Sequence, residues 1–279
     1  MTDELQRVGE RSNPVSLPAG HAVHPATVFT ALLRRDMRVA RRELPYFLVR
    51  TALQPILMVT VFGFLLPKMG VVGRGYTASL LPGILAISLA LAALQSVALP
   101  MVTDFGWTKE IEDRLLAPGP TWLVAVEKVT SGIIQGMVAA AVVLPVARLI
   151  IGPIAGLTWS HLGQVIAVAL MGGAAFSSLG LWMGTAIPPQ QIGLMFSVVL
   201  APMIFFGCAY YPWVGLRLVP ALQYCVLVNP MVYVAEGMRS ALTPQLPHMN
   251  QIAVFGALVL ITALFMLLGL RSFDRKAMS

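Results

Sequence analysis

The chain has 279 residues, of which 57% are hydrophobic and only 11% are charged. So few ionisable side chains cannot cover a soluble protein of this size, which excludes a soluble fold and places most of the chain in a membrane. The formal net charge of +7 fits contact with anionic lipid and does not require nucleic acid as a partner.

The N-terminal arm divides into two parts. Residues 1–25 are rich in Pro, Ser, Gly and charge, which predicts a disordered cytoplasmic tail. Across 26–46, apolar residues recur at helical spacing while arginines, among them Arg38 and Arg42, fall on another face. This pattern predicts an amphipathic interface helix in the inner headgroup layer. A plain polybasic topology signal is the alternative.

Continuous apolar runs dominate the rest of the chain. Crossing about 30 Å of hydrocarbon takes roughly 20 helical residues, and runs without alternation favour helices over a β-barrel. The charge-free stretch 149–216 is too long for one span, and Pro188–Gln191 supplies a turn within it. We therefore expect an all-α polytopic membrane protein with six transmembrane helices, near residues 47–66, 79–103, 128–150, 162–186, 191–211 and 251–270.

The distribution of basic residues predicts the orientation. With both termini in the cytoplasm, 14 of the 19 Lys and Arg residues lie inside and five lie outside. This bias agrees with the positive-inside rule. We expect a multi-pass protein of the plasma (inner) membrane, with 272–279 as a second cytoplasmic tail.

Residues 104–120 form a charged island between two apolar runs, with six of the 31 charges of the chain. One helical face would carry the apolar side chains and the others would carry the charges, before Pro118 ends the helix. An apolar ridge with charges at its rim suits a coupling helix docked on a soluble partner, although a solvated amphipathic loop has the same pattern. The candidate contact residues are Trp107, Lys109, Ile111, Glu112, Asp113 and Leu115, together with Arg38 and Arg42 of the N-terminal amphipathic helix.

The outer segment 212–240 holds apolar stretches too short to cross a membrane, broken by prolines. Such pieces predict re-entrant helices between the fifth and sixth spans, because their backbone must be covered by protein. Glu236 and Arg239 are one helical turn apart, so they form either a structural ion pair or a gate or substrate contact. Cys208 and Cys225 lie on this same side, and their spacing leaves a disulfide open.

Sequence motifs for chemistry are missing. No lysine stands in a phosphate-binding loop, no Cys-His spacing suits zinc, and no nucleophile elbow is present. The twelve acidic residues fall in predicted loops, tails or span ends, which disfavours a self-contained ion-coupled carrier. We expect no enzymatic activity and no bound cofactor or metal, so the energy for transport must come from another protein.

Three short patterns carry a family resemblance. Glu112 precedes Pro118 by six residues with Leu115 and Leu116 between them, Gly207 is followed by Tyr211-Pro212, and Asn229-Pro230 is followed by Arg239. In this order they resemble the membrane permease subunits of ABC-2 type exporters over about residues 30–270. The chain departs from the family at Lys109, where Gly is frequent, and at Arg114, where Leu is frequent, which affects the docking register.

The resemblance implies a six-span ABC-2 type transmembrane domain over 47–271, with a coupling helix in the loop 104–120. It implies a P-loop ATPase subunit that binds ATP and Mg, a second permease subunit in a homo- or heterodimer, and export of an amphipathic drug, lipid or glycan-linked lipid. It also implies an outer gate or re-entrant segment that includes Tyr211, Pro212, Asn229, Pro230, Glu236 and Arg239. A secondary carrier and a membrane-embedded enzyme or assembly scaffold are the alternatives.

Overall fold

A computed structural model describes residues 24–73, 75–105, 120–153 and 156–277. Within these ranges every regular element is helical, so the predicted all-α class is confirmed. The elements are α2 (Pro25–Arg42), α3 (Leu44–Met58), the π-helix η1 (Val59–Leu65), α4 (Leu66–Lys68), α5 (Tyr76–Thr103), α7 (Thr121–Ile151), α8 (Leu162–Ala186), η3 (Pro189–Gln191), α9 (Ile192–Phe205), η4 (Trp213–Leu218), α10 (Pro220–Cys225), η5 (Val226–Val228), α11 (Pro230–Leu242) and α12 (Gln251–Ala277).

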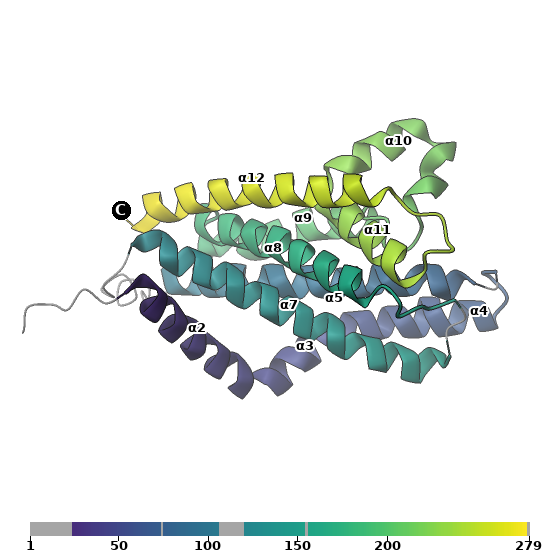
Figure 1. Ribbon diagram of the computed structural model, residues 1–279, viewed down its shortest axis with the longest axis horizontal. Helices are drawn as coiled ribbons and strands as arrows, with labels where there is room; N and C mark the ends of the chain where they lie inside the picture. Colours follow the sequence, from purple (N-terminus) through teal and green to yellow (C-terminus); the bar gives the residue numbers. More distant parts are fainter. Residues whose placement is uncertain (1–23, 74, 106–119, 154–155, 278–279) are drawn as a thin grey trace, which may run out of the picture.

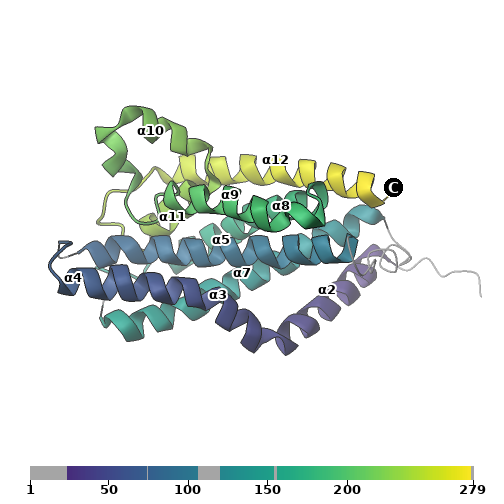
Figure 2. The ribbon, with the colours of Figure 1, turned by 180° about the vertical axis from the view of Figure 1, so that it is seen from behind.

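The long helices run side by side along one axis, and the chain reverses direction between them (Figures 1 and 2). The start of α2 and the end of α12 lie at one end of the bundle, which we call the inner end after the predicted orientation. The turn after α4 and the protruding α10 lie at the other, which we call the outer end.

Among the residues that the structure describes, four helices, α5, α7, α8 and α12, are long and apolar enough to cross a membrane. Two shorter apolar helical segments, Leu53–Lys68 and Pro189–Phe205, overlap the predicted first and fifth spans at 47–66 and 191–211. The structure supports four spans by length and composition, and the count of six remains a prediction.

Helix α5 forms the centre of the bundle. In the most apolar 18-residue stretch of α5, 89% of the residues are buried, whereas in the corresponding stretch of α12 only 17% are buried. Helix α5 is therefore surrounded by protein, and α12 exposes apolar surface toward the expected lipid. Small residues permit the close packing around α5. A β-carbon at Gly180 of α8 would overlap the carbonyl oxygen of Leu94, and one at Gly132 of α7 would overlap the Val97 side chain.

The helix boundaries differ from the predicted ones where charged residues are involved. Helix α8 has the predicted bounds, whereas α7 begins at Thr121 and not near 128, and α12 continues past 270 to Ala277. Helix α7 therefore includes Glu127 and Lys128, both of which are buried within the protein. A charge that is covered by neighbouring helices does not mark the end of a helix, although it looks like an end in the sequence.

The outer segment contains two unlike parts. Helix α11 is buried along its length against α5, α8 and α12. The short helices before it project from the bundle around α10 (Figure 1) and expose apolar side chains, including Leu218 and Val228. Whether these pieces re-enter a membrane stays a prediction, because only their placement on the bundle is described.

Candidate functional site

The strongest buried polar feature is the pair Glu236 and Arg239 on α11. Both side chains are fully buried, and Arg239 Nη1 donates to Glu236 Oε1. Two charges removed from water are tolerated when they are paired and hydrogen-bonded, and within this pair only Arg239 Nε has no hydrogen-bond partner in the described part of the chain. The predicted contact across one helical turn is present, and both side chains are buried, unlike those of an i, i+3 pair on a helix surface.

The pair also binds backbone groups from separate parts of the outer end. Glu236 accepts from the backbone N–H of Trp213 at 2.9 Å and from that of Met249 at 2.8 Å. Arg239 Nη2 donates to the carbonyl oxygens of Cys208, at 2.9 Å, and Ser79, at 3.3 Å. Two side chains thus connect α11 with the start of η4, the loop before α12, the loop after α9 and the start of α5.

The other predicted outer residues surround this cluster and shape its loops. Asn229 caps α11 by accepting from Met231 N–H at 2.9 Å, and its amide donates to the Met203 carbonyl of α9 at the same distance. Pro230 follows at the first turn of α11, where a missing N–H has no cost. The hydroxyl of Tyr211 donates to Phe205 O at 3.0 Å, and Pro212 is the N-cap of η4.

The two cysteines are free thiols in the structure, Cys208 buried and Cys225 exposed. Cys208 has φ of 53°, a left-handed conformation that is unusual for a residue with a β-carbon. This turn directs its carbonyl toward Arg239. The contribution of Cys208 to the site is therefore a backbone oxygen.

The predicted coupling residues Trp107, Lys109, Ile111, Glu112, Asp113 and Leu115 lie outside the described residues. The two ends of their loop are described, and both contact α12. Phe105 packs edge-on against Phe273 with ring centroids 5.5 Å apart, and the Lys276 ammonium lies 5.2 Å from the centre of the Phe105 ring. On the other side of the loop, Thr121 Oγ1 donates to Asp274 Oδ1 at 3.0 Å. The last turns of α12 therefore hold both ends of the loop.

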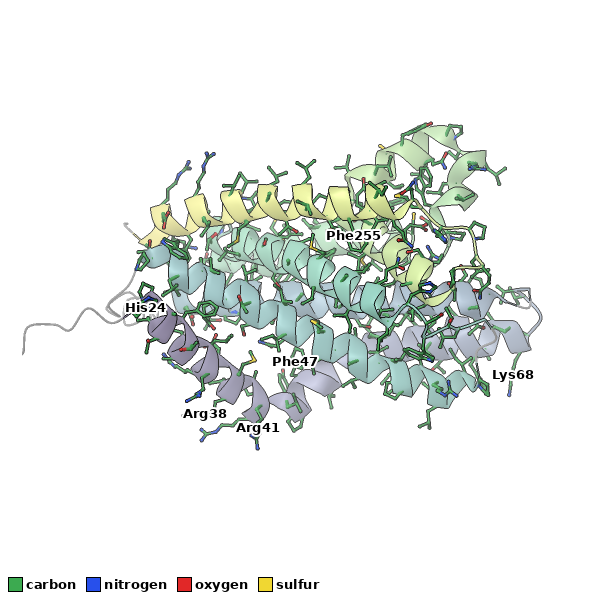
Figure 3. All side chains as sticks on the ribbon, viewed as in Figure 1. His24, Arg38, Arg41, Phe47, Lys68 and Phe255 are labelled. Carbon is green, nitrogen blue, oxygen red and sulfur yellow. The ribbon has the colours of Figure 1, made fainter. Side chains whose placement is uncertain are left out.

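The basic helix α2 contacts the bundle on one side and exposes its arginines on the other. Lys128 of α7 donates to Asp36 of α2 in a largely buried ion pair. Arg38 and Arg42 are exposed, and Figure 3 shows Arg38 and Arg41 pointing away from the bundle. The predicted partner residues on α2 are thus accessible to anionic headgroups or to another protein.

Sequence reasoning missed two kinds of contact. The first is the Asp36–Lys128 pair, whose residues are 92 positions apart. The second is the set of backbone groups that bind the outer pair, which the sequence cannot reveal because every residue has them; they belong to Trp213, Met249, Cys208 and Ser79.

Among the described residues, no group of three or more His, Cys, Asp or Glu side chains could hold a metal ion.

Comparison with known proteins defines the class of protein. Residues 27–243 match the model of the family described as ABC-2 type transporter. The chain is 26% identical to the inner membrane transport permease YadH of Escherichia coli K12 over 230 residues, which cover 79% of this chain and 86% of that protein. The YadH proteins of E. coli O157:H7 and Shigella flexneri match with the same identity and coverage.

The matched region is more than half of the chain, so the chain belongs to the ABC-2 type transporter family. The family match confirms the resemblance that was drawn from the three short patterns, which begin at Glu112, Gly207 and Asn229, and it establishes a membrane transport permease.

Proposed function

We propose that this chain is the membrane-spanning permease subunit of an ATP-driven exporter. The observation that carries the proposal is the ABC-2 type match over 27–243, in a chain whose sequence lacks a phosphate-binding loop of its own. Two permease subunits would work with two cytoplasmic ATPase subunits, which bind ATP and Mg and supply the free energy.

The geometry supports a route for that energy. ATP binding in the partner would draw the ATPase subunits together and displace the loop 106–119. Both ends of this loop are held by the last turns of α12, so its displacement would move α12 along with α5 and α7. Packed helices change between discrete arrangements, and a push at the inner end can thereby repack the outer end.

The substrate in this proposal is an amphipathic molecule, a drug, a lipid or a glycan-linked lipid, which leaves the cytoplasm or the inner leaflet. The bundle supports this class because it exposes apolar surface along α12 and α9 and carries a basic amphipathic helix at its inner end. An ion-coupled carrier would instead transport without an ATPase partner, and an embedded enzyme would convert a lipid.

Purification of the tagged chain from its native membrane tests the source of energy. We expect a P-loop ATPase subunit to co-purify, and we expect ATP hydrolysis in the complex and none in the chain alone. Mass spectrometry of the purified complex and a phosphate-release assay check both points. Robust hydrolysis by the isolated chain, or transport that depends on a proton gradient alone, would contradict the proposal.

Cysteine labelling in intact cells tests the orientation. A cysteine at Ser279 or at Glu110 should react with a membrane-impermeant maleimide only after the inner membrane is opened, and a cysteine at Gly73 should react without this step. The exposed Cys225 is first replaced by Ser so that it does not contribute. Labels that place Ser279 and Glu110 on opposite sides would exclude the proposed topology.

A further inference from the structure

Helices α2, α3, α5 and α7 line a cavity of about 600 Å³ that opens near the inner end of the bundle. This volume is in the range of small-molecule sites, about 300–1,000 Å³. Helix α2 ends at Arg42 and α3 starts at Leu44, and the two form an elbow that stands away from α5 and α7 (Figure 2). The cavity lies between this elbow and the core.

The cavity extends from the inner end toward the middle of the bundle. Its lining residues on α5 run from Gln95 to Asp104, which spans about 14 Å at 1.5 Å per residue. On α7 the lining runs from Lys128 to Gln135, and Gln135 lies close to the midpoint of this 31-residue helix. Because α7 is long and apolar enough to cross a membrane, the deep half of the cavity lies within the expected hydrocarbon layer.

Amides and hydroxyls line the deep half of this cavity. They are Gln95 and Ser96 of α5 and Ser131 and Gln135 of α7. Polar side chains at this depth are costly in a membrane helix unless they face water, a ligand or a polar partner. Four of them on two facing helices, around one cavity, indicate a site for a polar group.

The hydrogen-bonding capacity of these four side chains is only partly used. Ser96 Oγ donates to Ala93 O at 3.0 Å, so its oxygen can still accept a bond. Gln135 Nε2 donates to Ser131 Oγ at 3.2 Å, which leaves a second N–H and the oxygen of that amide, and the hydroxyl hydrogen of Ser131. The Gln95 amide makes no hydrogen bond to another described residue. Both donors and acceptors are therefore available to a ligand.

Charged side chains line the cavity closer to the inner end. Lys128 lies one helical turn before the deep pair on α7, and it is paired with Asp36 of α2. Arg35 and Asp104 also line this part and have interaction partners of their own. A head bound in the deep half would therefore be held by the amides and hydroxyls.

Apolar and aromatic side chains continue from the cavity to the surface of the bundle. Val39, Phe47 and Leu99 line the cavity beside its polar groups. Beyond the elbow, Val49 and Leu53 of α3 are exposed toward the expected lipid. An amphipath could therefore keep its head in the deep half while its chain leaves along α3 into the bilayer.

We propose that this cavity binds an uncharged amphipath with several hydroxyl groups in its head, a sugar joined to an apolar chain. Hydroxyl groups both donate and accept hydrogen bonds, as the deep side chains do, whereas an ammonium head only donates and a phosphate head accepts. The proposal deepens the proposed function and rests on it for transport, because it narrows the amphipathic substrate to one with a polyhydroxyl head. Such a ligand has two sources, a glycolipid of the membrane and a soluble glycoside.

Native mass spectrometry of the full-length chain tests the site without transport or ATP. The detergent is lauryldimethylamine oxide, because a maltoside or glucoside detergent would itself compete for the site. The chain is titrated with palmitoyl-oleoyl glucosyl glycerol and, separately, with the chain-matched phosphatidylethanolamine and phosphatidic acid. We expect the glucolipid to be retained about fivefold more than either, the effect of about one additional hydrogen bond. Equal retention, or preference for a charged head, would overturn the polyhydroxyl head.

Variants of the two deep glutamines test the position of the head. Gln95→Leu and Gln135→Leu keep the size of the side chain and remove its amide, and each should lower retention of the glucolipid about fivefold. Retention of phosphatidylethanolamine should stay the same, which shows that the bundle is intact. Gln251→Leu makes the same change at an exposed position at the start of α12 and should have no effect. Unchanged selectivity in both cavity variants would overturn the site.

A second pair of variants tests the cavity by filling it. Ala40 lines the cavity, and Ala31 lies on the opposite, exposed face of the same helix. Ala40→Phe should reduce retention of the glucolipid about fivefold, the scale of one lost hydrogen bond, while the matched Ala31→Phe should leave it unchanged. Retention that is unaffected by Ala40→Phe would place the glucolipid elsewhere and overturn the site.

Competition with octyl glucoside below its micellar concentration distinguishes the two sources. Displacement of the glucolipid supports soluble glycosides as ligands, and retention of the lipid in its presence supports the membrane glycolipid alone. The binding result is separate from the proposed function: failure to find an ATPase partner would remove the exporter and leave the site, whereas loss of binding would remove the site and leave the exporter.

Discussion

Arg239→Gln is expected to lower the free energy of unfolding by about 3 kcal/mol or more, because it leaves the buried Glu236 carboxylate without its counter-charge. Glu236→Gln should cost a similar amount, since the Arg239 guanidinium would then meet only carbonyl oxygens. The double variant should be milder than the two single losses added together. Unfolding in mixed detergent and transport, measured for all three, form a cycle that isolates the coupling.

The exposed Arg217, also at the outer end, provides the matched control. Arg217→Gln removes the same charge from the surface and should change the free energy of unfolding by less than about 0.5 kcal/mol. Strict additivity in the cycle would show that Glu236 and Arg239 do not interact. A double variant that is stable and still fails to transport would assign the pair to the outer gate as well as to the fold.

Trp107→Ala and Glu112→Ala are expected to reduce transport and substrate-stimulated ATP hydrolysis by about tenfold or more while insertion and abundance stay close to normal. An aromatic anchor or a rim charge at a partner interface contributes about 1–3 kcal/mol, and in the proposed coupling role both side chains would face the ATPase and not the bundle. Transport into inverted vesicles and co-purification of the ATPase measure the two consequences.

Trp159, about half exposed at the outer end, serves as the matched control. Trp159→Ala removes the same side chain from the side opposite the proposed ATPase and should leave hydrolysis unchanged. Normal transport by both loop variants would instead support the alternative that residues 104–120 form a solvated amphipathic loop without a coupling role.

The fold class and much of the bundle could be predicted because each helix that crosses a membrane needs roughly 20 mostly apolar residues in a row. Helix α8 was predicted at both ends, since its apolar run is bounded by His161 and by Pro188. Helix α7 begins at Thr121, before the predicted span start near 128, where Lys128 resembles a residue at the membrane surface. In the structure it is covered by α2 and paired with Asp36, a tertiary contact that hydropathy does not contain.

The outer cluster was predictable only in part. The spacing of Glu236 and Arg239 on one helix indicated their contact, because side chains three positions apart meet across a turn. The sequence could not indicate that the pair is fully buried, or that four backbone groups from distant segments converge on it. These positions depend on how the loops after α9 and before α12 fold over α11.

The attachment of the inner loop to α12 has a practical consequence for expression. Phe273, Asp274 and Lys276 contact the residues on either side of the loop 106–119, so the C-terminal turns of α12 lie beside the surface expected to meet the ATPase. A fluorescent protein fused rigidly to this end would occupy the space of the proposed ATPase subunit, and we expect it to give a well-folded but inactive permease. Fusions for localisation or purification are better separated from Ala277 by a long flexible linker.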